Sequence, residues 1–237
     1  MKKLMLGAAN GVLRAATCIV LAAPAFGADL AARTYAKATA NTVPDVVYDW
    51  TGFYVGGHIG GALAGPDSLE RHSGRFLGGA QIGFDRQFAP NWVIGSEIEL
   101  SGLVGSSGQG VLFPSGTLVT DKTNLIGSVT ARLGYTWGPV LLYAKVGSAF
   151  RDNTDIRASA GGVPVAVTAN GLHELGITAG GGFEYRLAPN WSARAEYQYY
   201  NFGDGHFASG PAAIVGSKFW NDEHTVKLGI NYRFKGS

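Results

Sequence analysis

Alternating apolar and polar positions run through this chain from Trp50 almost to its last residue. Every second residue is apolar in eight segments, which is the period of β-strands that separate two different environments. Each segment exceeds the usual globular strand of about 5–6 residues and suits the roughly 9–11 residues of a tilted membrane-spanning strand. The eight segments cover residues 52–63, 75–88, 91–102, 122–137, 140–151, 172–187, 191–202 and 223–234.

The connections between these segments alternate between very short and long. Three short turns contain Pro90, Pro139 and Pro189, which cannot continue a hydrogen-bonded ladder. Four long connections, rich in glycine, serine and aspartate, span 64–74, 103–121, 152–171 and 203–222. Outer-membrane barrels have this layout, with the short turns facing the periplasm. The pattern therefore predicts an all-β fold, an eight-stranded antiparallel up-and-down transmembrane β-barrel over residues 50–237.

The two faces of the predicted strands differ sharply in polarity. One face is apolar throughout, and the other carries five acidic and six basic residues. Because an eight-stranded barrel is only wide enough for side chains to fill it, these charges should meet and pair inside. We interpret them as a salt-bridged lumen; an ion path or gate is the alternative. The predicted lumen charge network is Asp85, Glu97, Glu99, Arg132, Lys145, Glu184, Arg186, Arg194, Glu196, Lys227 and Arg233.

Aromatic residues gather at the predicted strand ends, where amphipathic rings can lie among lipid headgroups. The tryptophans at the short-turn ends, Trp50, Trp92, Trp137 and Trp191, predict a periplasmic aromatic girdle. A less regular outer girdle is predicted from Phe150, Tyr199, Tyr200, Phe202, Phe219 and Trp220. Arg86 falls on the apolar face, but it lies near a turn, where a lipid-facing charge costs only about 0–1 kcal/mol.

The first 27 residues have the features of a secretory signal peptide. Lys2 and Lys3 precede an apolar run from Ala15 to Ala23, and Ala25-Phe26-Gly27 is a small-x-small cleavage site. We therefore predict a signal peptide over 1–27, a flexible N-terminal periplasmic segment over 28–49, and export of the rest. The single cysteine, Cys18, lies in the predicted leader, so the mature chain should have no thiol for disulfides, metals or nucleophilic chemistry.

Composition adds two constraints. The 36 glycines are about twice the usual share of roughly 7%, which suits close-packed, strongly tilted strands. Removing Lys2, Lys3 and Arg14 from the 19 basic residues leaves 16 against 17 acidic ones. A nearly neutral mature chain has no electrostatic basis for binding nucleic acid.

Catalytic and cofactor chemistry is not indicated. The five histidines are scattered without the spacing of metal ligands, so we expect no metal, cofactor or catalytic residues. The enzymatic alternative is a site built from His224, Glu223 and a loop serine. The glycine-rich run 105–110 lacks the Lys-Ser/Thr and the helix of a phosphate-binding loop, and it is predicted to be a flexible outer loop.

Three stretches resemble one family. They are WTGFYVGG at 50–57, the segment ADLAARTY at 28–35, and HTVKLGINYRF at 224–234. Together they resemble the alphaproteobacterial outer-membrane immunogenic proteins, small porin-family barrels similar to the OmpA membrane domain. The resemblance implies a cell outer membrane location and loops exposed to host or surface ligands. It also implies insertion by the barrel-assembly machinery, with Leu228, Ile230, Tyr232 and Phe234 as the assembly signal, although Lys235-Gly236-Ser237 follow here.

The leading functional prediction is an outer-membrane barrel with a structural or surface-interaction role, surrounded by outer-membrane lipids and lipopolysaccharide. Two alternatives remain open from the sequence. A narrow passive diffusion channel would use the same barrel with an open lumen. An exported lipocalin-like barrel would instead turn its apolar face inward to hold a ligand.

Overall fold

The computed structural model describes residues 48–65, 68, 74–104, 110–120, 123–152, 156–171 and 173–234. The predicted signal peptide over 1–27, nearly all of the segment 28–49, residues 105–109 and the last three residues lie outside this part. In the described residues, no helix is long and apolar enough to cross a membrane.

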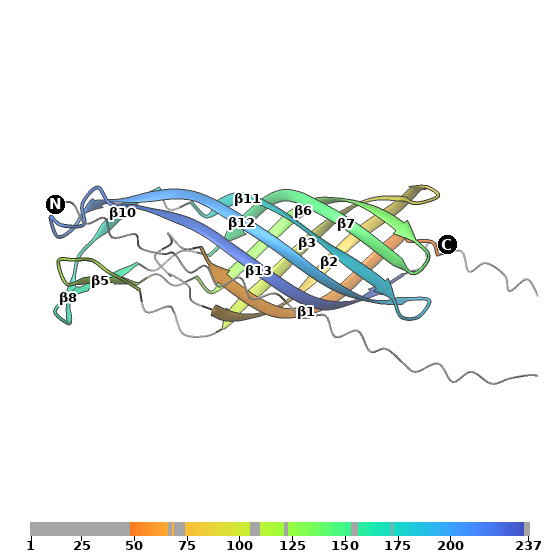
Figure 1. Cartoon of the computed structure of the whole chain (residues 1–237), viewed down its shortest axis with the longest axis horizontal. Helices are drawn as coiled ribbons and strands as arrows, with labels where there is room; N and C mark the ends of the chain where they lie inside the picture. Colours follow the sequence, from red (N-terminus) through yellow and green to blue (C-terminus); the bar gives the residue numbers. More distant parts are fainter. Residues whose placement is uncertain are drawn as a thin grey trace, which may run out of the picture. The chain divides into compact units, whose positions relative to one another are not determined.

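Eight long strands form a closed antiparallel β-barrel (Figure 1). Each strand pairs with its neighbour, and β13 closes the barrel by pairing with both β12 and β1. The fold class predicted from the alternating pattern is therefore confirmed. The strands are β1 (Gly52–Ala64), β2 (Gly74–Ala89), β3 (Trp92–Val104), β6 (Leu125–Trp137), β7 (Val140–Arg151), β11 (Leu175–Arg186), β12 (Trp191–Ser209) and β13 (Lys218–Arg233).

The short turns lie together at one end of the barrel, as alternating strand direction requires. The β6–β7 turn consists of Gly138 and Pro139, and Gly138 adopts a φ of 60°, which an L side chain would strain. The β2–β3 turn contains Pro90 and the β11–β12 turn contains Pro189. We call this the short-turn end and the opposite one the long-loop end.

The two last strands are longer than the alternating pattern predicted. β12 continues to Ser209 rather than ending at Phe202, and β13 begins at Lys218 rather than at Glu223. The β12–β13 register shifts between Asn201 and Asp204, and Gly203 in the shift has a φ of 80°. Such a bulge inserts an extra residue and breaks the period of two. A search for unbroken alternation therefore ends β12 too early, whereas β13 keeps its alternation from Glu223 back to Phe219.

Two connections predicted as plain loops contain further short strands. A separate four-stranded sheet joins β4 (Val111–Leu112), β5 (Thr117–Thr120), β8 (Arg157–Ala160) and β9 (Val163–Val165), in that order. The short strand β10 (Thr168–Asn170) pairs with the extended part of β12. Strands of two to four residues are too short to reveal a period, so alternation could not predict them.

This small sheet packs on the extended β12–β13 hairpin and forms what we call the cap. Val119 of β5 and Ala158 of β8 share an apolar cluster with Phe207, Ile214 and Phe219. The long-loop end therefore carries a folded structure with its own hydrophobic core.

Candidate functional site

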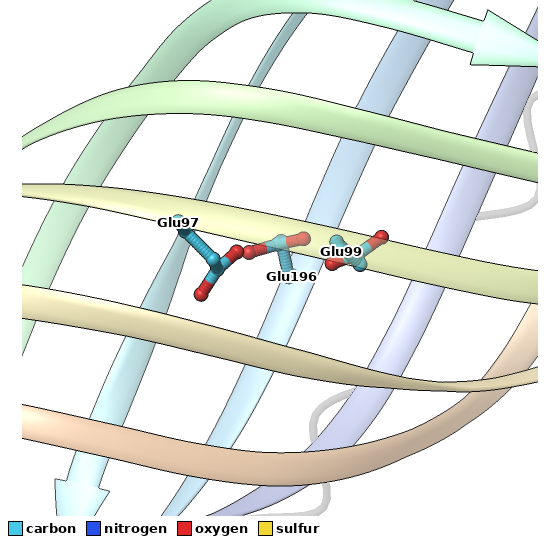
Figure 2. Close-up of side chains that lie close together, drawn as sticks. All are labelled: Glu97, Glu99 and Glu196. Atoms are coloured by element: carbon cyan, nitrogen blue, oxygen red, sulfur yellow. The ribbon is translucent and has the colours of Figure 1, made fainter.

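The lumen of the barrel contains a cage of three acidic and three basic side chains. Glu97, Glu99 and Glu196 approach one another from β3 and β12 (Figure 2). Lys145 Nζ lies 3.0 Å from Glu97, 3.5 Å from Glu99 and 2.7 Å from Glu196.

Two further bases complete the cage. Arg194 pairs with Glu97, lies 2.9 Å from Glu99 and lies 3.5 Å from Glu196. Lys227 pairs with Glu99 and lies 2.9 Å from Glu196. Each carboxylate therefore contacts at least two cations, as buried charges require.

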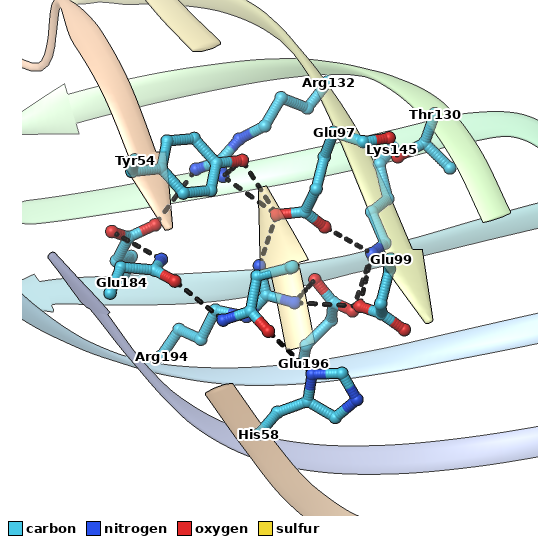
Figure 3. Close-up of polar contacts among 12 residues, drawn as sticks. Tyr54, His58, Glu97, Glu99, Thr130, Arg132, Lys145, Glu184, Arg194 and Glu196 are labelled. Carbon is cyan, nitrogen blue, oxygen red and sulfur yellow. Dashed lines mark hydrogen bonds and ion pairs between the residues drawn. The ribbon is translucent and has the colours of Figure 1, made fainter. Parts of the chain in front are cut away.

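Closer to the short-turn end, a second group of charges adjoins the cage. Arg132 lies 3.4 Å from Asp85, 3.2 Å from Glu184 and 3.7 Å from Glu97, so it connects the two groups (Figure 3). Arg233 pairs with Asp85 at 2.8 Å and lies 3.7 Å from Glu184. All these side chains are buried. The structure thus brings together ten of the eleven predicted charges, five acids and five bases.

Arg186 does not join this network, contrary to the prediction. Its guanidinium donates to the carbonyl oxygens of Pro189 and Asp49 at 2.9 and 2.7 Å. It also stacks over the ring of Trp50 at 4.6 Å. Arg186 is the last residue of β11, so backbone carbonyls at the turn lie within its reach and replace a carboxylate as acceptor. Without Arg186, the charges in the network balance.

Trp50 is also placed differently from the prediction. It was expected in the periplasmic girdle, but its side chain is fully buried between Arg186 and Arg233, whose guanidinium carbons lie 4.6 and 5.4 Å from the ring. Arg233 also donates to the Trp50 carbonyl at 2.6 Å. Trp50 precedes β1, so strand alternation does not determine which way it points. It closes the short-turn end of the lumen.

Three buried tyrosines belong to the network; Tyr54 and Tyr143 were not predicted there, and Tyr200 was predicted on the outer girdle instead. Their hydroxyls donate one hydrogen bond to each glutamate of the cage: Tyr54 to Glu97 at 2.7 Å, Tyr143 to Glu196 at 2.8 Å and Tyr200 to Glu99 at 3.2 Å. These bonds satisfy acceptor sites that the cations leave open. Alternation from the outward neighbours Phe53 and Leu142 would have placed Tyr54 and Tyr143 inside.

A chain of neutral groups extends the network across the lumen. His58 lies 2.7 Å from Gln81 and 2.8 Å from Ser101, and Gln81 donates to Asn231 at 2.7 Å. Asn231 in turn donates to Glu184 at 3.1 Å. The lumen therefore contains one connected polar network, of which Figure 3 draws the central part.

Inward-facing glycines make room for this network. A Cβ on Gly83 would collide with the ring and hydroxyl of Tyr54, and a Cβ on Gly95 would collide with the Asp85 carboxylate. In both cases, a buried polar side chain from the adjacent strand, Tyr54 or Asp85, lies directly over the inner side of the glycine. The high glycine content is thus partly explained by the filled lumen.

Apolar layers lie on both sides of the ionic network. Toward the long-loop end, buried side chains from six strands form one cluster: Ala62, Leu77, Leu103, Ile126, Ala149, Tyr200 and Phe202. Toward the short-turn end, Trp50, Val93, Leu141 and Tyr143 form another. Charges in the middle of the lumen are therefore separated from both mouths by packed apolar groups.

The three-glutamate group does not fit a cation site. Three carboxylates within 4.8 Å of one another could in principle hold a metal ion. Lys145, Arg194 and Lys227 already occupy the space between them and balance their charge. A bound cation would have to displace these ammonium and guanidinium groups.

The proposed enzymatic grouping of His224 and Glu223 is not brought together. Glu223 points into the barrel and pairs with Arg75 at 3.0 Å. His224, its neighbour in a strand, lies on the outer wall beside Tyr197, 2.7 Å from the hydroxyl. Adjacent residues of a strand face opposite sides, so these two cannot share one site.

The outer wall carries the remaining predicted residues. Trp92, Trp137 and Trp191 are exposed near the short-turn end, where a girdle was expected. Leu228, Ile230 and Phe234 are exposed, and Tyr232 is half-buried. Of the predicted outer girdle, Tyr200, Phe202 and Phe219 point inward and are buried, so only Phe150, Tyr199 and Trp220 remain on the wall.

An apolar outer wall around a charged, filled interior is the arrangement of a membrane-spanning barrel. The chain belongs to the outer membrane protein β-barrel domain family, whose model matches residues 15–234. It is 30% identical to the 31 kDa outer-membrane immunogenic protein of Brucella melitensis, over 95% of this chain and 100% of the relative. It is 32% identical to the 22 kDa outer membrane protein of Rhizobium leguminosarum, over 78% of each chain.

Among solved structures, the chain is similar to Neisserial surface protein A, with a TM-score of 0.45 at 18% identity over 78% of this chain and 98% of that one. The family and its relatives identify this protein as an outer-membrane β-barrel of the cell outer membrane. The resemblance to the immunogenic proteins is therefore confirmed, and the lipocalin-like alternative is wrong, because the apolar face points outward. In such barrels the short turns face the periplasm and the long loops face the exterior.

Proposed function

We propose that this protein is a closed structural barrel that displays its cap at the cell surface for interaction, and that it conducts no solute. The observation that carries the proposal is the filled lumen. Ten paired charges occupy its middle, and an apolar layer lies on each side of them. An ion crossing this path would have to break ion pairs and pass through two layers of packed apolar side chains.

The cap supports the surface-interaction part of the proposal. Connections that only had to join strands would have no need of a hydrophobic core, yet Val119, Ala158, Phe207, Ile214 and Phe219 are all buried there. A folded cap presents a fixed surface and costs less entropy on binding than mobile loops would. We infer that its partners are surface or host ligands, and that the barrel-assembly machinery reads the outward residues of β13.

Planar-bilayer recording of the refolded protein tests the closed lumen. We expect no stable conductance steps for the wild-type barrel. The variant Leu77→Gly/Ile126→Gly, which removes two side chains of the apolar layer, should begin to admit ions. Stable steps from the wild-type protein that change in size in Lys145→Met would contradict the proposal and favour a narrow diffusion channel.

The proposal includes the absence of enzymatic activity. Among the described histidines, His58 lies inside the barrel, where Gln81 and Ser101 hold it behind the apolar layers and no substrate reaches it. His224 lies on the outer wall away from Glu223. Incubation with outer-membrane lipids followed by mass spectrometry should leave those lipids chemically unchanged.

A further inference from the structure

One side of the outer wall is polar and aromatic at the level where the strands approach the cap. Here β12 and β13 carry what we call the outer strip: Tyr197, Tyr199, Asn201, Trp220, Asp222 and His224. Tyr199 pairs in register with His224, and Asn201 pairs with Asp222. All six lie on the outward face and are half-buried or exposed.

The polar groups of the outer strip are organised by contacts among themselves. Tyr197 Oη lies 2.7 Å from His224 Nδ1, and His224 Nε2 lies 3.7 Å from Asp222 Oδ2. The rings of Tyr199 and His224 are 5.0 Å apart. Asn201 donates to Tyr199 Oη at 3.1 Å. These contacts fix the positions of a carboxylate, an imidazole and two phenol hydroxyls side by side.

Most corresponding positions on the other strands are apolar, and Ser148 on β7 is an exposed polar exception. The outward residues nearest the long-loop end are exposed hydrophobic side chains: Leu63 on β1, Phe76 on β2, Val104 on β3, and Leu175 and Ile177 on β11. Leu63 pairs directly with His224 across the β1–β13 seam. The outer strip therefore begins at the level where neighbouring strands still contact hydrocarbon and continues upward to Trp220, at the level of lipid headgroups.

We propose that the outer strip binds the sugar headgroup of an outer-leaflet glycolipid. The face of Trp220, which is exposed, can pack on the apolar C–H face of a sugar ring. The Asp222 carboxylate and the Asn201 and Tyr199 side chains can exchange hydrogen bonds with its hydroxyls. A lipid-linked sugar reaches this height on the wall because its acyl chains run along the apolar residues below.

The carboxylate favours a neutral sugar over a phosphate as the ligand. The Asp222 carboxylate lies 3.7 Å from His224 Nε2 within the outer strip, whose six residues include no lysine or arginine. The nearest outward base on β13, Lys218, lies beyond Trp220 on the cap side. An anionic headgroup would be repelled by Asp222, whereas a sugar hydroxyl donates to it in a charge-assisted hydrogen bond. This inference depends on the membrane location established by the family, but not on whether the lumen is closed.

Native mass spectrometry of the detergent-solubilised full chain tests the site. The two probes are a monoglucosyl diacylglycerol and a phosphatidylglycerol with the same acyl chains. We expect the wild-type protein to retain the glucosyl lipid at least about fivefold better. Trp220→Ala and Asp222→Asn should each lower that retention about five- to tenfold. Phosphatidylglycerol retention should stay unchanged in Trp220→Ala and should rise in Asp222→Asn, which loses the repelling carboxylate.

Trp137→Ala is the matched control, because Trp137 is 50% exposed on the same wall near the opposite end, and Trp220 is 51% exposed. It should leave glucosyl-lipid retention unchanged, and heat-modifiable migration on gels verifies that every variant is folded. Equal retention of the two lipids by the wild type would overturn the proposal. An equal loss in Trp137→Ala would also overturn it, since that outcome indicates general packing of lipid against aromatic residues.

Discussion

The β12–β13 hairpin has charged inward side chains at one end and apolar inward side chains at the other. In the membrane part, inward side chains such as Arg194, Glu196 and Lys227 are charged, and outward ones such as Leu228 are apolar. Beyond the bulge at Gly203, the inward side chains Phe207 and Phe219 are apolar. The outward ones there include Asp204, His206 and Lys218, which are exposed.

This reversal shows that the solvent outside determines which residues go inside. In hydrocarbon, the outer wall must be apolar, so the polar side chains that remain can only pair within the lumen. Above the membrane, water surrounds the hairpin, and burial of apolar area again provides the driving force. The bulge adds one residue to β12 where the surroundings change, so even-numbered residues point inward before it and odd-numbered residues point inward after it.

The largest effect is expected from Arg194→Ala in the ionic part. Arg194 contacts Glu97, Glu99 and Glu196, so its loss leaves buried negative charge without a partner. We expect the free energy of unfolding to fall by about 3–5 kcal/mol. Urea unfolding from lipid vesicles, followed by tryptophan fluorescence, measures the change. Lys218→Ala, which removes an exposed base from the cap, should change it by less than about 0.5 kcal/mol.

A smaller effect is expected from Ile98→Arg on the lipid-facing side. Ile98 lies between Glu97 and Glu99 in the chain but points out of the barrel. An arginine there should cost about 2–4 kcal/mol if it lies near the middle of the bilayer. The same vesicle unfolding experiment measures it. If Ile98→Arg were neutral while Glu99→Ile was also tolerated, the assignment of faces on β3 would be wrong.

The smallest effect is expected from Val119→Ala in the cap. Val119 is fully buried among Ala158, Phe207 and Phe219, and losing two methyl groups should cost about 2 kcal/mol. Because the cap has its own core, the loss should appear as faster proteolysis of residues 110–120 with no change in barrel unfolding. An equal loss of barrel stability would instead indicate that cap and barrel unfold as one unit.

The sequence predicted the barrel because hydrocarbon and lumen impose a strict period of two on every crossing strand. That period alone assigns Glu97, Arg132 and Lys227 to one face and their neighbours Ile98, Leu133 and Leu228 to the other. The same period would have placed Tyr54 and Tyr143 in the lumen, but the prediction considered only charged residues. The exact pairs depend on the barrel's stagger, which no single strand encodes.

Some errors occur where alternation does not apply, whereas Tyr200 and Phe202 share the inward parity of Glu196 and were assigned to the outer girdle against it. Trp50 precedes the first strand, and Arg186 ends another where carbonyl oxygens are within reach. Phe207 lies beyond a bulge that changes the parity of β12, and both Phe207 and Phe219 lie in the cap, where the inward side chains are apolar. The cap strands are too short for any period, and their pairing depends on contacts between segments distant in the chain.

Labelling from the lipid phase tests the orientation of the wall most directly. A photoactivated carbene carried on a phospholipid acyl chain would be released around the native barrel, and modified residues would be identified by tandem mass spectrometry. We predict modification of Leu133, Phe183 and Leu228, which are exposed, and none of their chain neighbours Arg132, Glu184 and Lys227, which are buried. Modification of those three charged residues in place of the apolar ones would contradict the account.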